Sequence, residues 1–252
     1  DYVLSRFEEN SKKLYRSQSY LRYGMDYSTK VPSFQKFINQ FIDEICAAKL
    51  PMHLHWRKLI ETDSIMKYFI LKLKKRIGFE EKVKVSRILV SQKKFIEASQ
   101  KLHDKLFLNN SNKKIVLLNQ AGSGWNPIES TKYFLKRKII LFTRDPRDQF
   151  AELKQIKKAN SVDSFIDWYK EMQRRIKDIE NPTLIKLRFE DFVNKNNQIV
   201  ELICNHISLS SNIISDYKPD LSKKNIGKYK KFLNNQEIDK IENNLSEYFY
   251  DR

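Results

Sequence analysis

Four short apolar runs, separated by helix-like stretches, constrain the fold of this chain more than any other feature of its sequence. The runs are Arg87–Val90, Lys114–Leu118, Lys138–Phe142 and Thr183–Leu187. Helical spacing occupies residues 92–108, 127–136 and 147–180, the last divided near Asn160–Ser161. Runs that are apolar on both faces and alternate with crossover helices are typical of a covered parallel sheet. We therefore expect an α/β fold, a three-layer parallel sheet with helices on both faces.

The N-terminal third has a different pattern, because its apolar residues recur at helical intervals of three and four. The clearest case is a helix preceded by Ser33 as N-cap, with Phe34, Phe37, Ile38, Phe41, Ile42 and Ile45 on one face. This pattern predicts a helical region over residues 1–85, followed by an α/β core over residues 86–252, in one structural domain. The segment Ser208–Gly227 is expected to be a loop, and the closing helix to begin at Asn235.

Composition excludes several classes of protein. The chain has 252 residues, of which 40% are hydrophobic, and this is too apolar for a disordered chain. Its apolar runs of about four residues are far shorter than the roughly 18 needed to span a bilayer, so no transmembrane helix is expected. The first residues lack the pattern of a secretion signal, and Cys46 and Cys204 are too few for a disulfide framework. These features predict a cytoplasmic location.

The formal net charge of +17 predicts an anionic partner, which could be nucleic acid, a membrane surface or a phosphorylated small molecule. The alternative is a background richness in Lys, Asn and Ile, which requires no ligand. No metal site is predicted, because His53 and His55 have no Cys or carboxylate cluster nearby.

The most informative segment is Arg144-Asp145-Pro146-Arg147-Asp148, directly after an expected strand. Asp145 suits a helix N-cap, Pro146 the first helical position, and Asp148 the third residue of a capping box. Arg144 would then lie beside the free N–H groups of a helix start, and the two together favour a phosphate. In the alternative interpretation, Arg144 or Arg147 only pairs with Asp145 or Asp148 at the capped terminus.

Two other loops are also candidate binding loops, but their patterns are less specific. Asn119–Pro127 contains Gly122 and Gly124 and enters a helix, as either a binding loop or a plain turn. The lysine-rich segment Ser222–Lys231 is either a flexible anion clamp or a solvated loop.

Taken in order, these segments resemble the PAPS-dependent sulfotransferases, a P-loop-like α/β family that transfers a sulfuryl group from 3′-phosphoadenosine-5′-phosphosulfate (PAPS). Arg144–Asp148 resembles the family's 3′-phosphate element, and Phe189-Glu190-Asp191-Phe192 is similar to its Tyr-Glu-Asp-Leu element. Lys223–Lys230 looks like its closing Arg-Lys-Gly-x-x-Gly-Asp-Trp-Lys segment. Asn119–Pro127 falls where the family has a Lys-Ser/Thr-Pro loop. The resemblance covers about residues 85–250.

The resemblance implies a set of cofactor-binding residues and PAPS as the sulfuryl donor, with no metal. Arg144 contacts the 3′-phosphate, Phe189 lies near the adenine, and the segment from Lys223 and Lys224 to Gly227 closes over the nucleotide. Glu152 stands at the position of a serine that shares the 3′-phosphate in the family, and its carboxylate would repel that phosphate. Residues 1–85 would cover the acceptor site.

Two further positions depart from the family's pattern. The lysine of the middle loop is replaced by Asn119 or Gln120, and residues 1–85 contain no Gly/Ser/Thr-rich phosphosulfate loop. That loop is expected either upstream of Asp1 or to have been lost. The predicted function is sulfuryl transfer to a hydroxyl or amine of a small molecule or glycan. The alternatives are an inactive sulfotransferase-like protein that binds a nucleotide or partner, and a basic nucleic-acid-binding protein, which the lack of a nucleic-acid motif disfavours.

Overall fold

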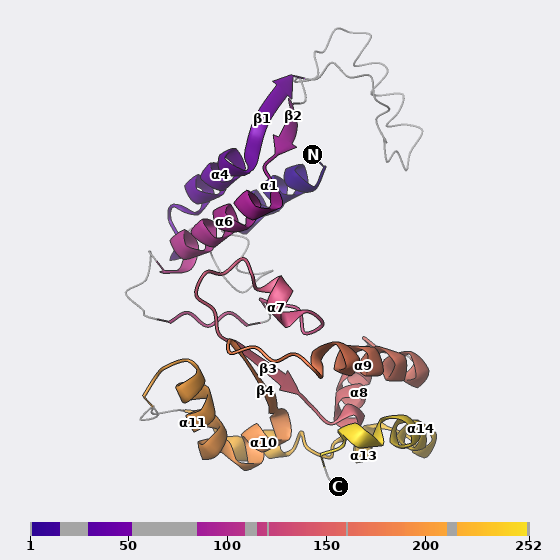
Figure 1. Ribbon diagram of the computed structural model, residues 1–252. Coiled ribbons are helices and arrows are strands. Elements are labelled where there is room, and N and C mark those ends of the chain that lie inside the picture. Colours follow the sequence, from indigo (N-terminus) through magenta and orange to yellow (C-terminus); the bar gives the residue numbers. More distant parts are fainter. Residues whose placement is uncertain are drawn as a thin grey trace, which may run out of the picture. The chain divides into compact units, whose positions relative to one another are not determined.

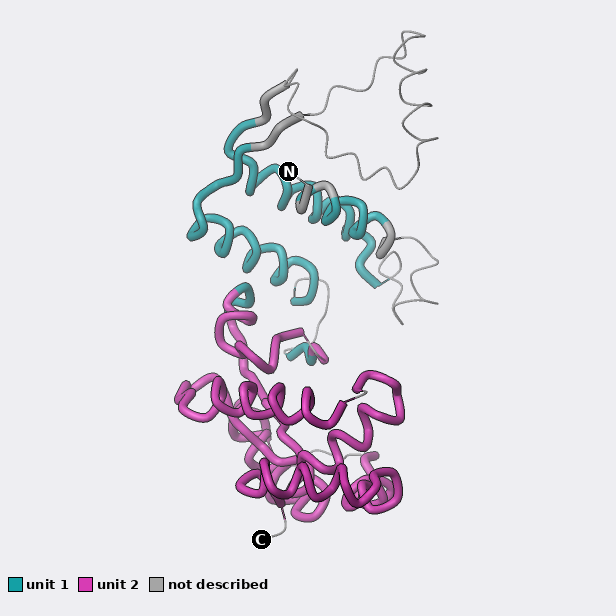
Figure 2. The backbone as a smooth tube through the Cα atoms, turned by 90° about the vertical axis from the view of Figure 1, so that its right-hand side faces the viewer, with its two compact units in different colours: residues 1–117, 133–135 teal, residues 118–132, 136–252 magenta. Residues whose placement is uncertain are grey.

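The computed structural model describes residues 2–15, 30–51, 85–108, 115–119, 121–159, 161–210 and 216–250. The chain divides into two compact units (Figure 2). Unit 1 comprises residues 1–117 and 133–135, and unit 2 comprises residues 118–132 and 136–252. Residues 86–117 therefore belong to the same compact unit as the N-terminal helices.

Unit 1 packs helices beside a two-stranded antiparallel sheet (Figure 1). Its elements are α1 (Tyr2–Tyr15), α4 (Phe34–Ile45), β1 (Cys46–Pro51), β2 (Val85–Leu89), α6 (Gln92–His103) and a π-helical turn, η1 (Asp104–Leu108). The predicted apolar face of α4 is confirmed, since Phe34, Ile38, Phe41, Ile42 and Ile45 are all buried. They form a core with Ala98 and Leu102 of α6 and Leu106 of η1.

Unit 2 contains a parallel strand pair and most of the helices. Its elements are α7 (Pro127–Ser130), β3 (Ile139–Thr143), α8 (Pro146–Gln155), α9 (Val162–Ile176), β4 (Leu184–Arg188), α10 (Phe189–Asn194), α11 (Asn196–His206), α12 (Pro219–Lys223), α13 (Tyr229–Phe232), α14 (Asn235–Leu245) and a 3-10 turn, η2 (Ser246–Tyr248). Its core joins α8, α9, α13 and α14 through Phe150, Ala151, Phe165, Ile166, Tyr169, Tyr229, Leu233, Ile241 and Leu245.

The parallel pair determines where the following loops emerge. β3 and β4 pair in register from Ile139 opposite Leu184 to Thr143 opposite Arg188, and α8 and α9 connect them. Because the strands run in the same direction, both end at the same edge of the sheet. Arg144 and Phe189, the residues that follow the two strands, therefore start side by side.

The predicted three-layer parallel sheet is wrong. The described part of the chain is mostly helical, and its strands form two separate sheets of two strands each. The run Arg87–Val90 enters β2, whose antiparallel partner β1 directly follows α4. Residues Ile115–Leu118 form no strand, and Leu117 is 86% exposed. Apolar runs alone therefore specify neither which segments become strands nor which strands pair.

Several helix boundaries agree with the sequence prediction and others do not. The break near Asn160–Ser161 is confirmed, because α8 ends at Gln155 and α9 begins at Val162. The closing helix begins at Asn235 as predicted, behind a capping box made by Asn234 and Glu237. The helix expected over residues 127–136 has only the four residues of α7, and the expected loop over residues 208–227 contains α12.

Candidate functional site

The start of α8 is locked by the side chain of its own N-cap. The Asp145 carboxylate accepts a hydrogen bond from the Arg147 backbone N–H at 3.0 Å, and Pro146 occupies the first turn. The N-cap prediction is therefore confirmed. Asp145 therefore occupies one of the N–H groups at the helix start.

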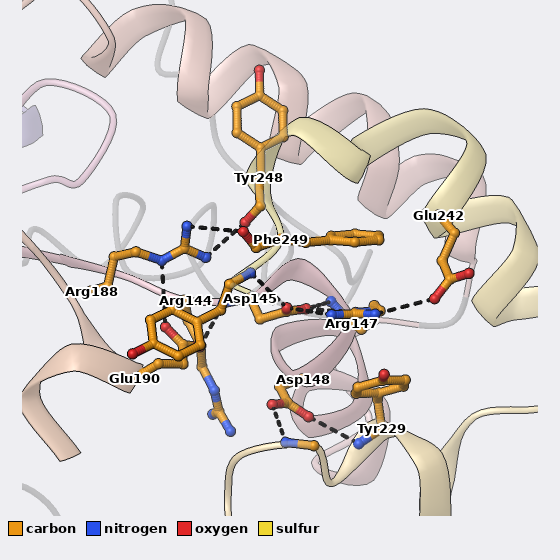
Figure 3. Close-up of polar contacts among 12 residues, drawn as sticks. Arg144, Asp145, Arg147, Asp148, Arg188, Glu190, Tyr229, Glu242, Tyr248 and Phe249 are labelled. Carbon is orange, nitrogen blue, oxygen red and sulfur yellow. Dashed lines mark hydrogen bonds and ion pairs between the residues drawn. The ribbon is translucent and has the colours of Figure 1, made fainter. Parts of the chain in front are cut away.

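Arg147 forms a sealed cluster with that cap. Its Nε and Nη2 donate to the two carboxylate oxygens of Asp145 at 3.0 and 2.8 Å, and its Nη1 donates to Glu242 of α14 at 3.2 Å. The guanidinium lies between the rings of Tyr229 and Phe249, 4.5 and 3.9 Å from their centroids (Figure 3). We call Asp145, Arg147, Tyr229, Glu242 and Phe249 the Arg147 cluster. It joins α8 to the C-terminal elements of unit 2.

Asp148 does not complete the predicted capping box. Its carboxylate instead accepts hydrogen bonds from the backbone N–H groups of Gly227 and Tyr229, at 2.7 and 2.9 Å (Figure 3). Gly227 has φ of +75°, a conformation that favours glycine. Burial raises the pKa of Asp148, and these two hydrogen bonds offset the effect only in part. Asp148 thereby holds the lysine-rich segment against α8.

The backbone N–H of Asp145 is bound instead by Glu190, at the start of α10. Glu190 is fully buried, and its Oε1 accepts this hydrogen bond at 2.8 Å. Burial raises the pKa of Glu190, and the hydrogen bond from Asp145 offsets this only in part. This contact fastens the end of β4 to the end of β3.

Arg144 points in a different direction from Arg147 and has a different kind of surroundings (Figure 3). Its guanidinium lies 4.9 Å from the centroid of the Phe189 ring, forms an ion pair with Glu152 of α8, and donates to the carbonyl oxygen of Asn225. The buried Nε of Arg144 has no hydrogen-bond partner among the described residues. Lys228 Nζ lies 3.5 Å from the same Glu152 carboxylate. We call Arg144, Glu152, Phe189, Asn225 and Lys228 the Arg144 cluster.

A shallow cavity opens on the Arg144 cluster. It has a volume of about 320 Å³ and is lined by Phe142, Thr143, Arg144, Gln149, Glu152, Leu153, Ile156 and Phe189. The backbone of Arg144 is fixed below it, because the buried Tyr169 hydroxyl donates to the Arg144 carbonyl at 2.9 Å. A fixed guanidinium, an aromatic ring and a cavity at the ends of two parallel strands are suited to bind a planar, anionic ligand.

One of the sequence alternatives is resolved by geometry. Arg147, not Arg144, pairs with Asp145 at the capped terminus. In the Asn119–Pro127 loop, Gly122 permits close packing against the end of α7, since a Cβ at Gly122 would lie 2.7 Å from Thr131 Cγ2. The Ser123 N–H also donates to Ser130 Oγ at 2.8 Å, so this loop closes on its own helix α7.

The structure brings some of the predicted site residues together and leaves others apart. Arg144, Glu152 and Phe189 share one cavity, and Gly227 is anchored to α8 next to Asn225 and Lys228. Lys223 is exposed and pairs with Asp220 at 2.7 Å, and Lys224 is also exposed. Sequence reasoning missed Lys228 and the carbonyl of Asn225 as members of the site. Both residues lie within two positions of Gly227, which the sequence had already placed at the site.

The described ranges show neither a metal centre nor a membrane-spanning helix. These residues contain no group of three or more His, Cys, Asp or Glu side chains that could hold a metal ion. His53 and His55 lie outside them. Likewise, none of the helices in these ranges is both long and apolar enough to cross a membrane.

Comparison of this chain with protein-family models, with curated proteins and with solved structures finds no match.

Proposed function

We propose that unit 2 carries the 3′-phosphoadenosine-binding site of a PAPS-dependent sulfotransferase. In that reaction an acceptor hydroxyl or amine attacks the sulfur of PAPS, and the bond between sulfur and the 5′-phosphate oxygen breaks. The acceptor leaves as its sulfuryl derivative, its proton is released, and adenosine 3′,5′-bisphosphate remains as the second product. This bisphosphate carries the groups that Arg144 and Phe189 are assigned to bind.

The observation that carries the proposal is the meeting of three segments that are far apart in the sequence. Arg144 follows β3, Phe189 follows β4, and Asn225 lies 81 residues after Arg144 and accepts its hydrogen bond. The family resemblance matched these segments one by one from their residues alone. Arg144 and Phe189 line one cavity at the carboxyl edge of β3 and β4, and Asn225 contacts Arg144. Parallel sheets bind their ligands at this edge.

The chemistry of the cavity agrees with a phosphorylated nucleotide. A guanidinium can form two parallel hydrogen bonds to a phosphate, and the Arg144 side chain lines the cavity. The Phe189 ring supplies an apolar face near the cation. A volume of about 320 Å³ is at the lower end of typical ligand cavities.

Calorimetric titration with adenosine 3′,5′-bisphosphate tests this site. We expect Arg144→Ala to weaken binding by about 10- to 100-fold, since it removes charge-assisted hydrogen bonds. The matched control is Arg174→Ala, which removes an exposed arginine that pairs with Glu171 on α9. The affinity of Arg174→Ala for the bisphosphate should stay within about twofold of the parent, because a distant surface charge is screened.

Two outcomes would contradict the proposal. The first is no binding of the bisphosphate to the parent chain at moderate salt. The second is binding that Arg144→Ala and Arg174→Ala weaken equally, together with a steep salt dependence and tighter binding of nucleic acid, as for a basic nucleic-acid-binding protein.

A further inference from the structure

Glu152 holds a position that conflicts with a phosphate site, and its contacts suggest why. Its carboxylate pairs with both Arg144 and Lys228, the two cations of the Arg144 cluster. The side chains of these cations are only 16% and 13% exposed, whereas the Glu152 side chain is 49% exposed. The two cations are therefore fixed in the wall of the site, and the carboxylate is the member that can move.

The electrostatic balance of the site agrees with this division. Burial alone would raise the pKa of Glu152, but the hydrogen bond and charge of Arg144 outweigh it, and Lys228 adds to the effect. The pKa of Glu152 is consequently lowered, so the group is an anion at neutral pH. An anion already lies where the bound phosphate is expected.

We propose that Glu152 is an internal anionic ligand of Arg144, which a 3′-phosphate must displace, and that it thereby weakens the binding of 3′-phosphorylated nucleotides. This inference rests on the proposed function. A singly charged group gains little binding free energy when it replaces the carboxylate, because Arg144 is paired with one negative charge both before and after the exchange. A doubly charged phosphate gains more, because it brings more negative charge to Arg144 than the carboxylate does. The exchange is therefore favourable for a doubly charged phosphate and not for a singly charged anion, and its cost falls only on nucleotides that carry a 3′-phosphate.

Lys228 gives the displaced carboxylate a second partner. Its Nζ lies 3.5 Å from the Glu152 oxygen that also faces Arg144, so Glu152 can release Arg144 and remain paired. Without Lys228, the displaced carboxylate would be an unpaired charge close to a phosphate. The exchange thus depends on both Glu152 and Lys228.

The experiment compares the parent chain with Glu152→Gln in titrations with adenosine 3′,5′-bisphosphate and with adenosine 5′-phosphate. In the parent, the 3′-phosphate has to break the half-exposed ion pair between Glu152 and Arg144. Glu152→Gln removes this pair, so affinity for the bisphosphate should rise about fivefold. Adenosine 5′-phosphate has no 3′-phosphate and does not displace Glu152, so its affinity should rise by less than about twofold. The discrimination between the two nucleotides therefore increases in the variant.

Glu171→Gln is the matched control. Glu171 also lies between two cations, since it pairs with Arg174 and Arg175 on the exposed side of α9. Its replacement changes the net charge by the same amount, and it should leave both affinities within about twofold of the parent. An equal gain in both variants would overturn the inference, because the effect would then come from overall charge.

A double-mutant cycle tests the part assigned to Lys228. Lys228→Gln should weaken bisphosphate binding in the parent chain and have little effect in the Glu152→Gln background. Equal weakening in both backgrounds would mean that Lys228 contacts the phosphate directly, and this would overturn its assigned part in the exchange.

The remaining outcomes separate this inference from the proposed function. If the parent binds the bisphosphate and Glu152→Gln binds it no better, the inference fails and the nucleotide site stands. If Glu152→Gln weakens binding of adenosine 5′-phosphate, Glu152 accepts a hydrogen bond from a ribose hydroxyl, which also overturns the inference. If neither chain binds either nucleotide, both proposals fail.

Discussion

The Arg147 cluster and the Arg144 cluster are built around arginines only three residues apart, but the two guanidinium groups differ in burial and in access to a cavity. Arg147 is buried, forked on Asp145 and enclosed by two aromatic rings. Arg144 faces a cavity, keeps a buried Nε without a partner, and pairs with a half-exposed carboxylate. An arginine with saturated contacts holds the fold, whereas one with a replaceable partner can bind a ligand.

The largest expected effect is the loss of stability when Arg147 is removed. Arg147→Ala leaves the buried Asp145 carboxylate without its partner, and breaking such a pair lowers the free energy of unfolding by about 3 kcal/mol. Arg144→Ala should lower it by less than about 1 kcal/mol, because Glu152 is half-exposed. Urea unfolding at fixed pH measures both values.

Arg147→Lys provides the control for this comparison. It keeps the charge but loses the fork on Asp145, so its stability should fall between that of the parent and that of Arg147→Ala. If Arg144→Ala proved as destabilising as Arg147→Ala, both arginines would be structural and the difference between the clusters would disappear.

Gly227→Ala should have an intermediate effect on stability. It tests the backbone conformation by which the lysine-rich segment Ser222–Lys231 is held against α8. The φ of +75° at Gly227 disfavours any residue with a Cβ, although a Cβ there would meet nothing within 4 Å. Gly227→Ala should therefore lower the free energy of unfolding by about 1 kcal/mol through backbone strain alone. Gly124→Ala is the matched control, because a Cβ there makes an ordinary 3.9 Å contact with Leu141. Equal unfolding energies for the two variants would show that the backbone at Gly227 is not strained.

Local signals in the sequence predicted local structure well. The N-cap and proline at Asp145–Pro146 placed the start of α8, and the spacing after Asn235 placed α14. These predictions hold because capping and periodicity depend on residues within a few positions of one another. The sheet could not be predicted in the same way. The run that became β2 pairs with β1, more than 30 residues earlier, and no periodicity encodes such a pairing.

The candidate site was predictable where strand direction determined it. Arg144 and Phe189 each follow a predicted strand, and a parallel pair brings both to one edge. Side-chain roles were harder to infer, because Asp148 fits the spacing of a capping box but binds the Gly227 and Tyr229 N–H groups across 79 and 81 residues. Lys223 and Lys224 fit the family's pattern in sequence, yet the residues of that segment that approach Arg144 and Glu152 are Asn225 and Lys228.

The smallest expected effect is a difference in the sign of the pH dependence of stability between two carboxyls. These are the buried Glu190, which binds the Asp145 N–H, and the half-exposed Glu152, which pairs with Arg144. The pKa of the buried Glu190 is raised, so the parent should lose stability relative to Glu190→Gln as pH increases above about 4.3, the ordinary value for Glu. The pKa of Glu152 is lowered, so the parent should lose stability relative to Glu152→Gln as pH falls below about 4.3, by less than about 1 kcal/mol for a half-exposed pair. Urea unfolding of the three chains between about pH 3 and pH 7 covers both windows. Slopes of the same sign would place both carboxyls in one kind of environment, and the contrast between the buried contact of Glu190 with Asp145 and the open Arg144 cluster would then fail.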